Sequence, residues 1–284
     1  MKKCFLAMAM LAFGVVGAQP LEKSLLWKIS GNGLKQPSYL YGTIHITCDA
    51  TLKPGVKPAM DATQQLYLEM DMDDPTLQQG MMSGMMMTDG KKMTDLASPE
   101  DIKIVNDFLI KNLGFPLEAM NTVKPIFVSM MFLTKMLDCT LQSVESELMN
   151  ISTEQKEEVL GLETLADQMA TLDAVPYEEQ MAELVKSAKS DLANDQKETA
   201  LLTELYAKQD IEGMLKAARE SDNVTTSKYE DELLVKRNKN WIPKIESIAK
   251  QKPTFFGVGA AHLAGENGVI RLLRKKGFKV EAVR

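Results

Sequence analysis

The two histidines of the sequence stand in the same short motif. Gly42 begins one copy, which ends at His45, and Gly259 begins the other, which ends at His262; both copies read Gly-x-x-His and follow apolar, aromatic runs typical of β-strands. Glycine permits a tight turn, and side chains just past the carboxyl ends of parallel strands gather at one sheet edge. A single copy could be an ordinary loop histidine. The repeated motif predicts that His45 and His262 share a functional site.

Two imidazoles and one carboxylate make a three-ligand site for a divalent metal ion, with an open position for water. The ion lowers the pKa of the bound water and polarises a carbonyl group, which is the usual route to hydrolysis at neutral pH. The candidate carboxylates follow predicted strands: Glu69, then Glu163, with Asp71 behind them. Glu69 is preferred because its strand is next in the chain after that of His45. We expect Zn, Mn or Co bound by His45, His262 and Glu69, with Glu69 as third ligand or general base.

Arg237 lies on the otherwise apolar stripe of a helix predicted over residues 228–250. A buried guanidinium needs a carboxylate or an anionic ligand, whereas a long arginine can also extend into solvent. Both interpretations stay open at this point. In the first, Arg237 would orient a catalytic carboxylate, such as Glu69 or Glu163, or a carboxylate of the substrate.

These residues must be positioned by an α/β (α+β) fold. Short apolar runs predict strands at 25–30, 38–46, 65–72, 158–163, 254–259 and 278–283, and the run at 65–72 alternates with period 2. Residues 75–250 are mainly helical, with one predicted helix covering 123–137, and the strand–helix–strand pattern of 254–283 indicates a parallel crossover. The sequence therefore predicts a single domain, residues 19–284, with a central mixed, partly parallel sheet and a large helical insertion. The methionine-rich tract 81–87 is interpreted as core or lid packing.

Composition and the first residues bear on location and partners. The net charge of −6 and pI near 5.2 argue against a nucleic-acid partner, because phosphate binding needs a basic surface. Residues 1–18 have a basic start, an apolar run and small residues ending at Ala18, which is typical of a secretory signal peptide. No later segment is apolar over a length that spans a membrane. We expect cleavage after Ala18 and an exported protein, periplasmic or secreted, without a stable membrane span.

Removal of residues 1–18 leaves two cysteines, Cys48 and Cys139. An even pair in an oxidising compartment favours a disulfide over two free thiols. Because Cys48 lies three residues after His45 in the chain, the bond would brace the loop that carries this histidine.

Several stretches together resemble the TraB/GumN family, whose animal relatives are the Tiki proteases. They are Tyr-Leu-Tyr-Gly-Thr-Ile-His at 39–45, Leu-Glu at 68–69, Gly-Leu-Glu-Thr at 161–164 with Gln168, Arg-Asn at 237–238 with Trp241, and Phe-Gly-Val-Gly-Ala-Ala-His-Leu at 256–263. The resemblance implies a fold related to the erythromycin-esterase and ChaN-like group, and a protease that depends on manganese or cobalt and trims an extracellular peptide. It also implies an essential glutamate, which maps onto Glu69. The tract 81–87 departs from the family pattern and leaves the substrate open.

Two classes of function follow. The first is an exported metal-dependent hydrolase acting on a peptide or protein. Its catalytic candidates are Glu69, Glu163 and Arg237, and its metal ligands would be His45, His262 and Glu69. A variant of this class is a metal-free esterase, in which a histidine activates water. The second is a non-catalytic peptide- or pheromone-binding protein that uses the methionine-rich tract as an adaptable groove. Metal content would distinguish the two classes.

Overall fold

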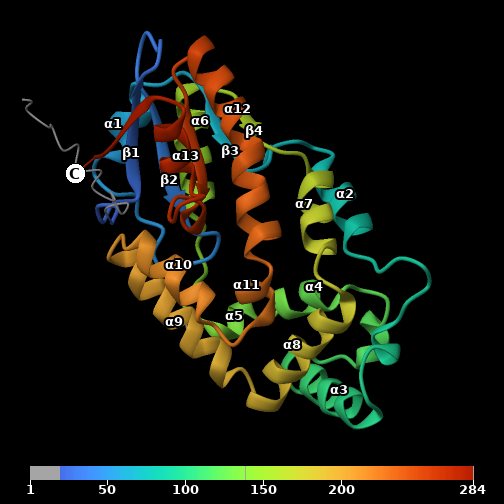
Figure 1. The fold of residues 1–284 in the computed structure, drawn as a ribbon. Coiled ribbons are helices and arrows are strands. Elements are labelled where there is room, and N and C mark those ends of the chain that lie inside the picture. The colour runs from blue at the N-terminus through green and yellow to red at the C-terminus, as the bar shows by residue number, and fades with distance from the viewer. Residues whose placement is uncertain (1–19, 138, 284) are drawn as a thin grey trace, which may run out of the picture.

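The computed structural model describes residues 20–137 and 139–283, and its centre is a mixed sheet flanked by helices (Figure 1). The strands are β1 (Leu26–Gly31), β2 (Ser38–Thr43), β3 (Leu66–Leu68), β4 (Val159–Gly161), β5 (Phe255–Gly259) and β6 (Phe278–Ala282). They lie in the order β4-β3-β5-β2-β1-β6; β4, β3, β5 and β2 are parallel, and β1 is antiparallel to both β2 and β6. The predicted mixed, partly parallel sheet is confirmed. The two strands of the final strand–helix–strand unit, β5 and β6, are not neighbours in the sheet, because β2 and β1 lie between them.

The four parallel strands end at the same edge of the sheet, and the predicted histidines and glutamates of the site each follow one of these ends. His45 comes two residues after β2, Glu69 directly after β3, Glu163 two residues after β4, and His262 three residues after β5. The two Gly-x-x-His motifs touch, since β2 and β5 are neighbours. A Cβ atom on Gly42 would lie 2.9 Å from Leu263 and 3.1 Å from Ala260, so a side chain at position 42 would separate the two motifs.

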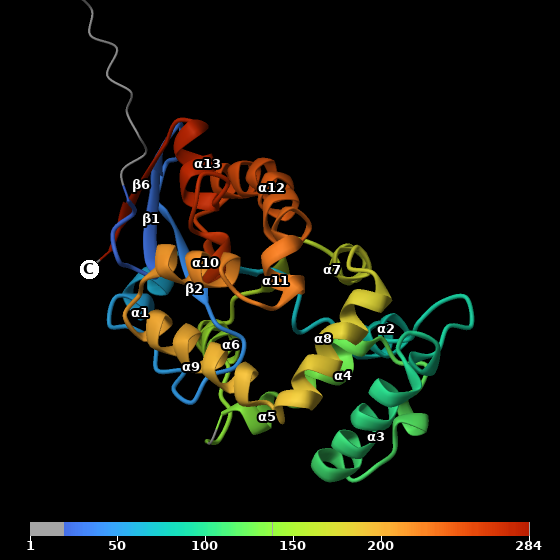
Figure 2. The same ribbon diagram turned by 60° about the horizontal axis from the view of Figure 1, so that its bottom comes forward.

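The helices account for most of the remaining chain. They are α1 (Val56–Asp61), α2 (Leu77–Gly84), α3 (Pro99–Leu113), α4 (Pro125–Met130), α5 (Leu133–Met136), α6 (Val144–Gln155), α7 (Leu165–Asp173), α8 (Tyr177–Ser190), α9 (Ala193–Ala207), α10 (Ile211–Arg219), α11 (Val224–Lys228), α12 (Arg237–Gln251) and α13 (Val269–Lys275), with a π-helical turn at Asp231–Lys236 before α12. α12 and α13 cover one face of the sheet, and α1 and α6 cover the other (Figures 1 and 2). The predicted helical region 75–250 is interrupted by β4.

The helix predicted over 123–137 is divided into α4 and α5. Val123 is extended and forms a β-bridge with Met86, so the helix begins only at Pro125, a residue suited to a first helical position. Other local signals agree with the structure. The Ser98 hydroxyl caps α3 by accepting from the Asp101 N–H, and Gly114 ends that helix with a positive φ of 81°.

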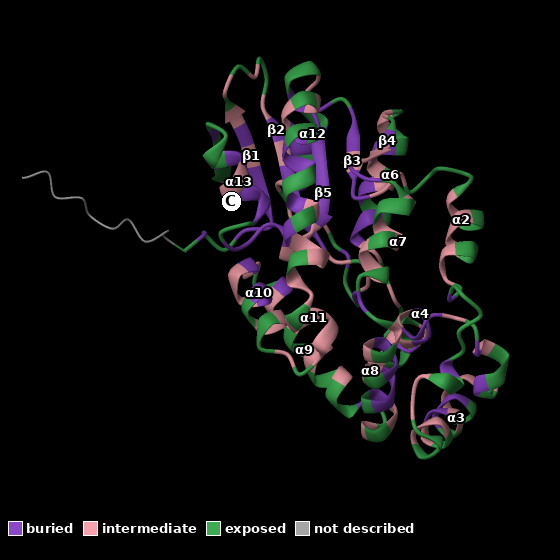
Figure 3. Cartoon of the chain, turned by 45° about the vertical axis from the view of Figure 1, so that its right-hand side comes forward, coloured by how far each residue is buried: buried purple, intermediate pink, exposed green. Residues whose placement is uncertain are grey.

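Buried apolar side chains form two clusters. The larger surrounds the sheet, whose central strands β2 and β5 are mostly buried (Figure 3), and includes Trp27, Phe255 and Phe256. The smaller lies among α3, α4 and α8, away from the sheet (Figure 2). The methionine-rich tract is divided between the smaller cluster and the surface, because Met87 belongs to that cluster whereas Met82 is 67% exposed.

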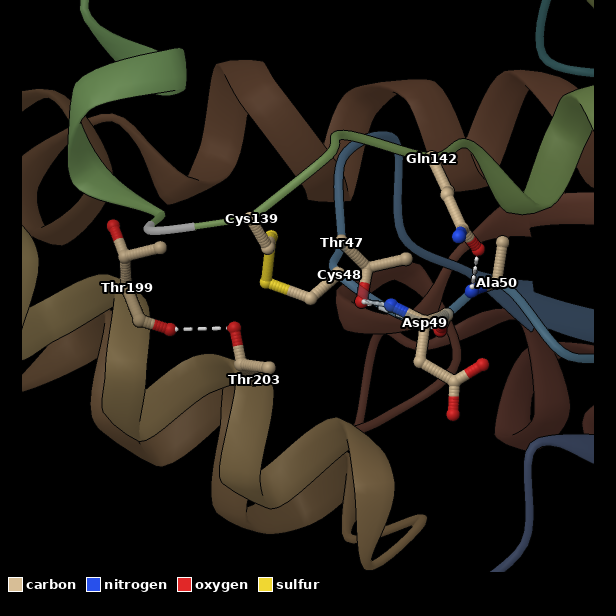
Figure 4. The surroundings of a disulfide bond; sticks show 8 residues. All are labelled: Thr47, Cys48, Asp49, Ala50, Cys139, Gln142, Thr199 and Thr203. Atoms are coloured by element: carbon tan, nitrogen blue, oxygen red, sulfur yellow. Dashed lines mark hydrogen bonds between the residues drawn. A yellow bond between two sulfur atoms is a disulfide. The ribbon is translucent and has the colours of Figure 1, made fainter.

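A disulfide joins Cys48 to Cys139, as the sequence predicts (Figure 4). Two further links hold the same segments together. Thr47 and Gln142 form a β-bridge, and the Ala50 N–H donates to the Gln142 side chain over 2.9 Å. The loop that follows β2 is therefore fixed to the residues that precede α6.

We expect the Cys48→Ala, Cys139→Ala double variant to unfold with a free energy about 4 kcal/mol lower than the oxidised wild type. The reason is that the bond closes a loop with a sequence separation of 91, which restricts the unfolded chain. Urea denaturation of both proteins measures the difference. Thiol labelling of the denatured, unreduced wild type should find neither Cys48 nor Cys139 free, and equal stabilities or two labelled thiols would contradict the prediction.

The predicted signal segment, residues 1–18, lies outside the described residues. Among the helices that the structure does describe, none combines the length and the apolar character that crossing a membrane requires.

Candidate functional site

Arg237 is the centre of a buried ionic cluster. Its guanidinium contacts Glu69 and Glu163, with 2.6 Å between Nη2 and Oε1 of Glu163, and Nη1 lies 3.1 Å from Nε2 of His262. The side chain is 13% exposed. The structure thus brings together Arg237, Glu69, Glu163 and His262, and of the two interpretations of Arg237 it supports burial against carboxylates.

The hydrogen bonds of Arg237 use all of its donors. Nε donates to Glu163, Nη1 donates to the Leu233 carbonyl and to His262, and Nη2 donates to Glu69 and Glu163. Because a guanidinium has five N–H groups, none is left for a carboxylate of a substrate in this arrangement. The role that remains for Arg237 is to hold the carboxylates of its own chain.

The sequence of α12 explains this position. Arg237 follows the π-helical turn directly, and Trp241 lies one helical turn later on the same side. The Trp241 indole donates to Glu163 over 2.9 Å, and its ring lies 4.9 Å from the centre of the guanidinium. Glu163 therefore receives hydrogen bonds from two residues of α12.

His262 is held in one tautomer. Nδ2 of Asn238 donates to the carbonyls of Asn267 and His262, at 2.9 and 3.3 Å, so Oδ1 of Asn238 faces Nδ1 of His262 at 2.7 Å. Nδ1 must then carry the hydrogen, which leaves the Nε2 lone pair to accept from Arg237. Burial lowers the pKa of His262 to about 3, so the ring is neutral at ordinary pH.

Glu69 is an ionised carboxylate with fixed orientation. Oε1 accepts from the Gly259 N–H over 2.7 Å, and Oε2 accepts from Arg237. Burial opposes ionisation of Glu69, but the neighbouring His262 and Arg237 side chains and the Gly259 N–H favour it, and the pKa falls to about 2. The strand β5 thus contributes both the second histidine motif and a backbone donor for Glu69.

His45 does not join this cluster. Its side chain is 69% exposed, and Nδ1 lies 2.7 Å from Oε1 of Glu145, whose Oε2 accepts from the Ser143 hydroxyl over 3.0 Å. Glu145 lies in the first turn of α6, where Ser143 is the N-cap. Sequence reasoning missed Glu145. The available signal was its place shortly after Cys139, the disulfide partner of the His45 loop.

A pocket of about 280 Å³ is lined by both His45 and Glu69, a member of the Arg237 cluster. It is lined by His45, Glu69, Glu145 and Gln168, and by apolar side chains from the segment after β3. Of the residues in the Arg237 cluster, Glu69 lines this pocket, whereas His262 is not among the lining residues. Glu163 lines two other cavities, of about 870 and 610 Å³.

The described side chains do not fit the predicted three-ligand metal site. Within residues 20–137 and 139–283, no three His, Cys, Asp or Glu side chains are grouped so that they could hold a metal ion. Arg237 provides the physical reason, because its guanidinium occupies the Nε2 lone pair of His262 and one oxygen of Glu69. A cation at this position repels a divalent ion. The metal-binding roles of His45, Glu69 and His262 stay a prediction.

We expect His45 to titrate well above an ordinary histidine. The hydrogen bond with Glu145 and the negative charge of that carboxylate raise the pKa of His45 to about 9. Since this value exceeds the unfolded value near 6.5, the stabilisation by the pair is fully present below pH 6.5 and is lost as the pH rises through about 9. An NMR titration of the imidazole measures the shift. The Glu145→Gln variant should return the pKa towards 6.5, and identical titrations of the two proteins would contradict the pairing.

Comparisons with known proteins agree with the sequence resemblance. The sequence model of the TraB/PrgY/gumN family matches residues 25–282. Metalloprotease TIKI1 of Danio rerio is 22% identical over 313 residues, which cover 91% of this chain and 63% of the relative. Metalloprotease TIKI2 of Danio rerio is 20% identical over 315 residues, with 91% and 60% covered. The chain thus spans less than two thirds of these relatives, and no solved structure matches it.

Proposed function

The chain belongs to the TraB/PrgY/gumN family, and on that premise we propose that it is a hydrolase of peptide bonds. Its active site would lie at the sheet edge where the parallel strands end. One observation carries the proposal: His45, oriented by Glu145, and Glu69, oriented by Arg237, line the same pocket although they follow different strands. The names of the two Danio rerio relatives support peptide bonds as the target. Export, argued from residues 1–18, is part of the same proposal.

In the proposed reaction, His45 is the general base. Glu145 accepts the Nδ1 hydrogen, which leaves Nε2 free to take a proton from water, and the carboxylate then stabilises the imidazolium that forms. Glu69 is a poor proton acceptor because its pKa is about 2. Its role is to accept a hydrogen bond from the attacking water and hold it in position. Arg237 and Glu163 are positioning residues that fix Glu69, and His262 completes their hydrogen bonds.

Dependence on a divalent ion, such as Mn, Co or Zn, is the finer part of the proposal. The names of the relatives support it, whereas the arrangement of the described residues does not. An ion could reach His262 and Glu69 only after Arg237 had released them. The test therefore includes metal as a variable.

Peptide binding without cleavage is the second candidate. It is favoured by the observation that Arg237 already satisfies both oxygens of Glu163 and one oxygen of Glu69, so that much of the polar centre is paired within the protein. A binding protein of this kind, which includes a pheromone-binding one, would have no need of His45 as a base.

The deciding experiment incubates the purified protein with a mixture of unstructured peptides and identifies new termini by mass spectrometry. Parallel samples contain a chelator or added Mn, Co or Zn. We expect cleavage by the wild type and not by the His45→Ala variant. Cleavage that requires an added ion supports the metal-dependent form, and cleavage that survives the chelator supports the metal-free form. Peptides that bind but are never cut would favour the second candidate.

A further inference from the structure

We propose that the pocket shared by His45 and Glu69 receives an apolar side chain of a peptide, and that the methionines of residues 70–81 form an adaptable wall around it. This inference rests on the proposed function, because it names the class of substrate for the same site. It concerns binding, however, and can be tested without cleavage.

The lining of the pocket is divided by chemical type according to the segments that supply it. The polar side chains come from the ends of β2 and β3 and from the starts of α6 and α7, and they are His45, Glu69, Ser143, Glu145 and Gln168. The apolar side chains come from one continuous segment, β3 to α2, and they are Leu68, Met70, Met72, Leu77 and Met81. A peptide whose reacting bond lies near His45 would therefore place a neighbouring side chain against an apolar wall. Against that wall a charged side chain would lose its hydration, because the five apolar side chains offer it neither a hydrogen bond nor an opposite charge.

The apolar wall can change its shape to accommodate different side chains of a ligand. α2 has no buried residue among its eight, and its contact with α7 depends on two glycines. A Cβ atom on Gly80 would lie 2.6 Å from Leu165, and one on Gly84 would lie 2.6 Å from Met169. Methionine has an unbranched, flexible side chain that fills irregular apolar spaces, and it is frequent at surfaces that accept several ligands. We infer tolerance for Leu, Met and Phe rather than selection of one residue.

The substrate extends beyond a single residue. Met70 and Leu77 line both this pocket and the cavity of about 870 Å³ that borders β4, so the two spaces share a wall. A pocket of about 280 Å³ accommodates one large side chain, and the adjoining cavity has room for the chain that continues from it. This arrangement fits a peptide better than a free amino acid.

The test uses fluorescent peptides that differ at one position, with Leu, Met, Phe, Asp or Lys there, and with the bond beside it replaced by an uncleavable ketomethylene group. We expect the apolar peptides to bind the wild type about tenfold more tightly than the charged ones. Met81→Gln should remove most of that preference, and Met81→Leu should retain it. Met130→Gln is the matched control, because Met130 is a 43% exposed methionine outside the pocket.

Each outcome decides the inference. Equal binding of apolar and charged peptides overturns it, as does an equal effect of Met81→Gln and Met130→Gln. The matching cleavable peptides separate it from the proposed function. Selective binding without cleavage supports the inference and contradicts the hydrolase, whereas cleavage without selectivity does the reverse. Circular dichroism of the Met81 variants confirms that the fold is unchanged.

Discussion

The His45→Ala and Glu69→Gln variants should each cleave peptides at least a hundredfold more slowly than the wild type. Loss of His45 removes the only base of the proposed mechanism that faces the pocket, and such a loss costs about 10²- to 10⁴-fold in rate. Glu69→Gln keeps the size of the side chain and leaves Glu163 to pair with Arg237, so the fold should persist. The measurement is kcat/KM on the same peptide, with thermal melts as a check of folding.

The pH dependence gives this prediction a second readout. The base form of His45 increases as the pH rises through about 9, so kcat/KM of the wild type should rise over that range. In Glu145→Gln the rise should move to lower pH, with a lower maximum. If a protein that lacks both His45 and His262 still cleaves at the wild-type rate, the shared site does not exist.

Arg237→Met should lower the free energy of unfolding by about 3–5 kcal/mol. The change leaves Glu69 and Glu163 buried without their cation, which is the costly way to break a buried ion pair. Arg219→Met is the matched control, because Arg219 also pairs with a carboxylate, that of Glu230, but is 50% exposed. An exposed pair contributes at most about 1 kcal/mol. Urea denaturation of the three proteins measures both values. Equal decreases in the free energy of unfolding would show that the buried cluster around Arg237 contributes no more than an exposed ion pair.

Much of the fold could be predicted because its signals are local. Short apolar runs predicted all six strands, and the Ser98 and Gly114 signals predicted α3. The late start of α4 could not be predicted, since it depends on the bridge between Val123 and Met86, a contact between segments far apart in the sequence. An apolar run predicts that a segment is buried more reliably than it predicts where a helix begins or is interrupted.

The site was predicted in part for a similar reason. The repeated motif placed His45 and His262 at one sheet edge, and the apolar stripe of α12 marked Arg237 as unusual. The sequence contains no signal that Arg237 would stand between His262 and an incoming ion, because that depends on how far a side chain reaches across the sheet edge. Glu145 was missed because an acidic residue in the first turn of a helix is common and stabilises the helix by itself.

The strand order has a consequence for how the molecule forms during synthesis. β5 lies between β2 and β3 and pairs with both, yet it is made only after residue 254, later than both of these strands and later than helices α1 to α12. Until then, β2 and β3 lack the strand that joins them, and contacts so distant in sequence form slowly. A growing chain can complete its helices early, but the edge that brings His45 and Glu69 into one pocket cannot exist. The pocket that His45 and Glu69 line therefore forms only after β5, Phe255–Gly259, has been made.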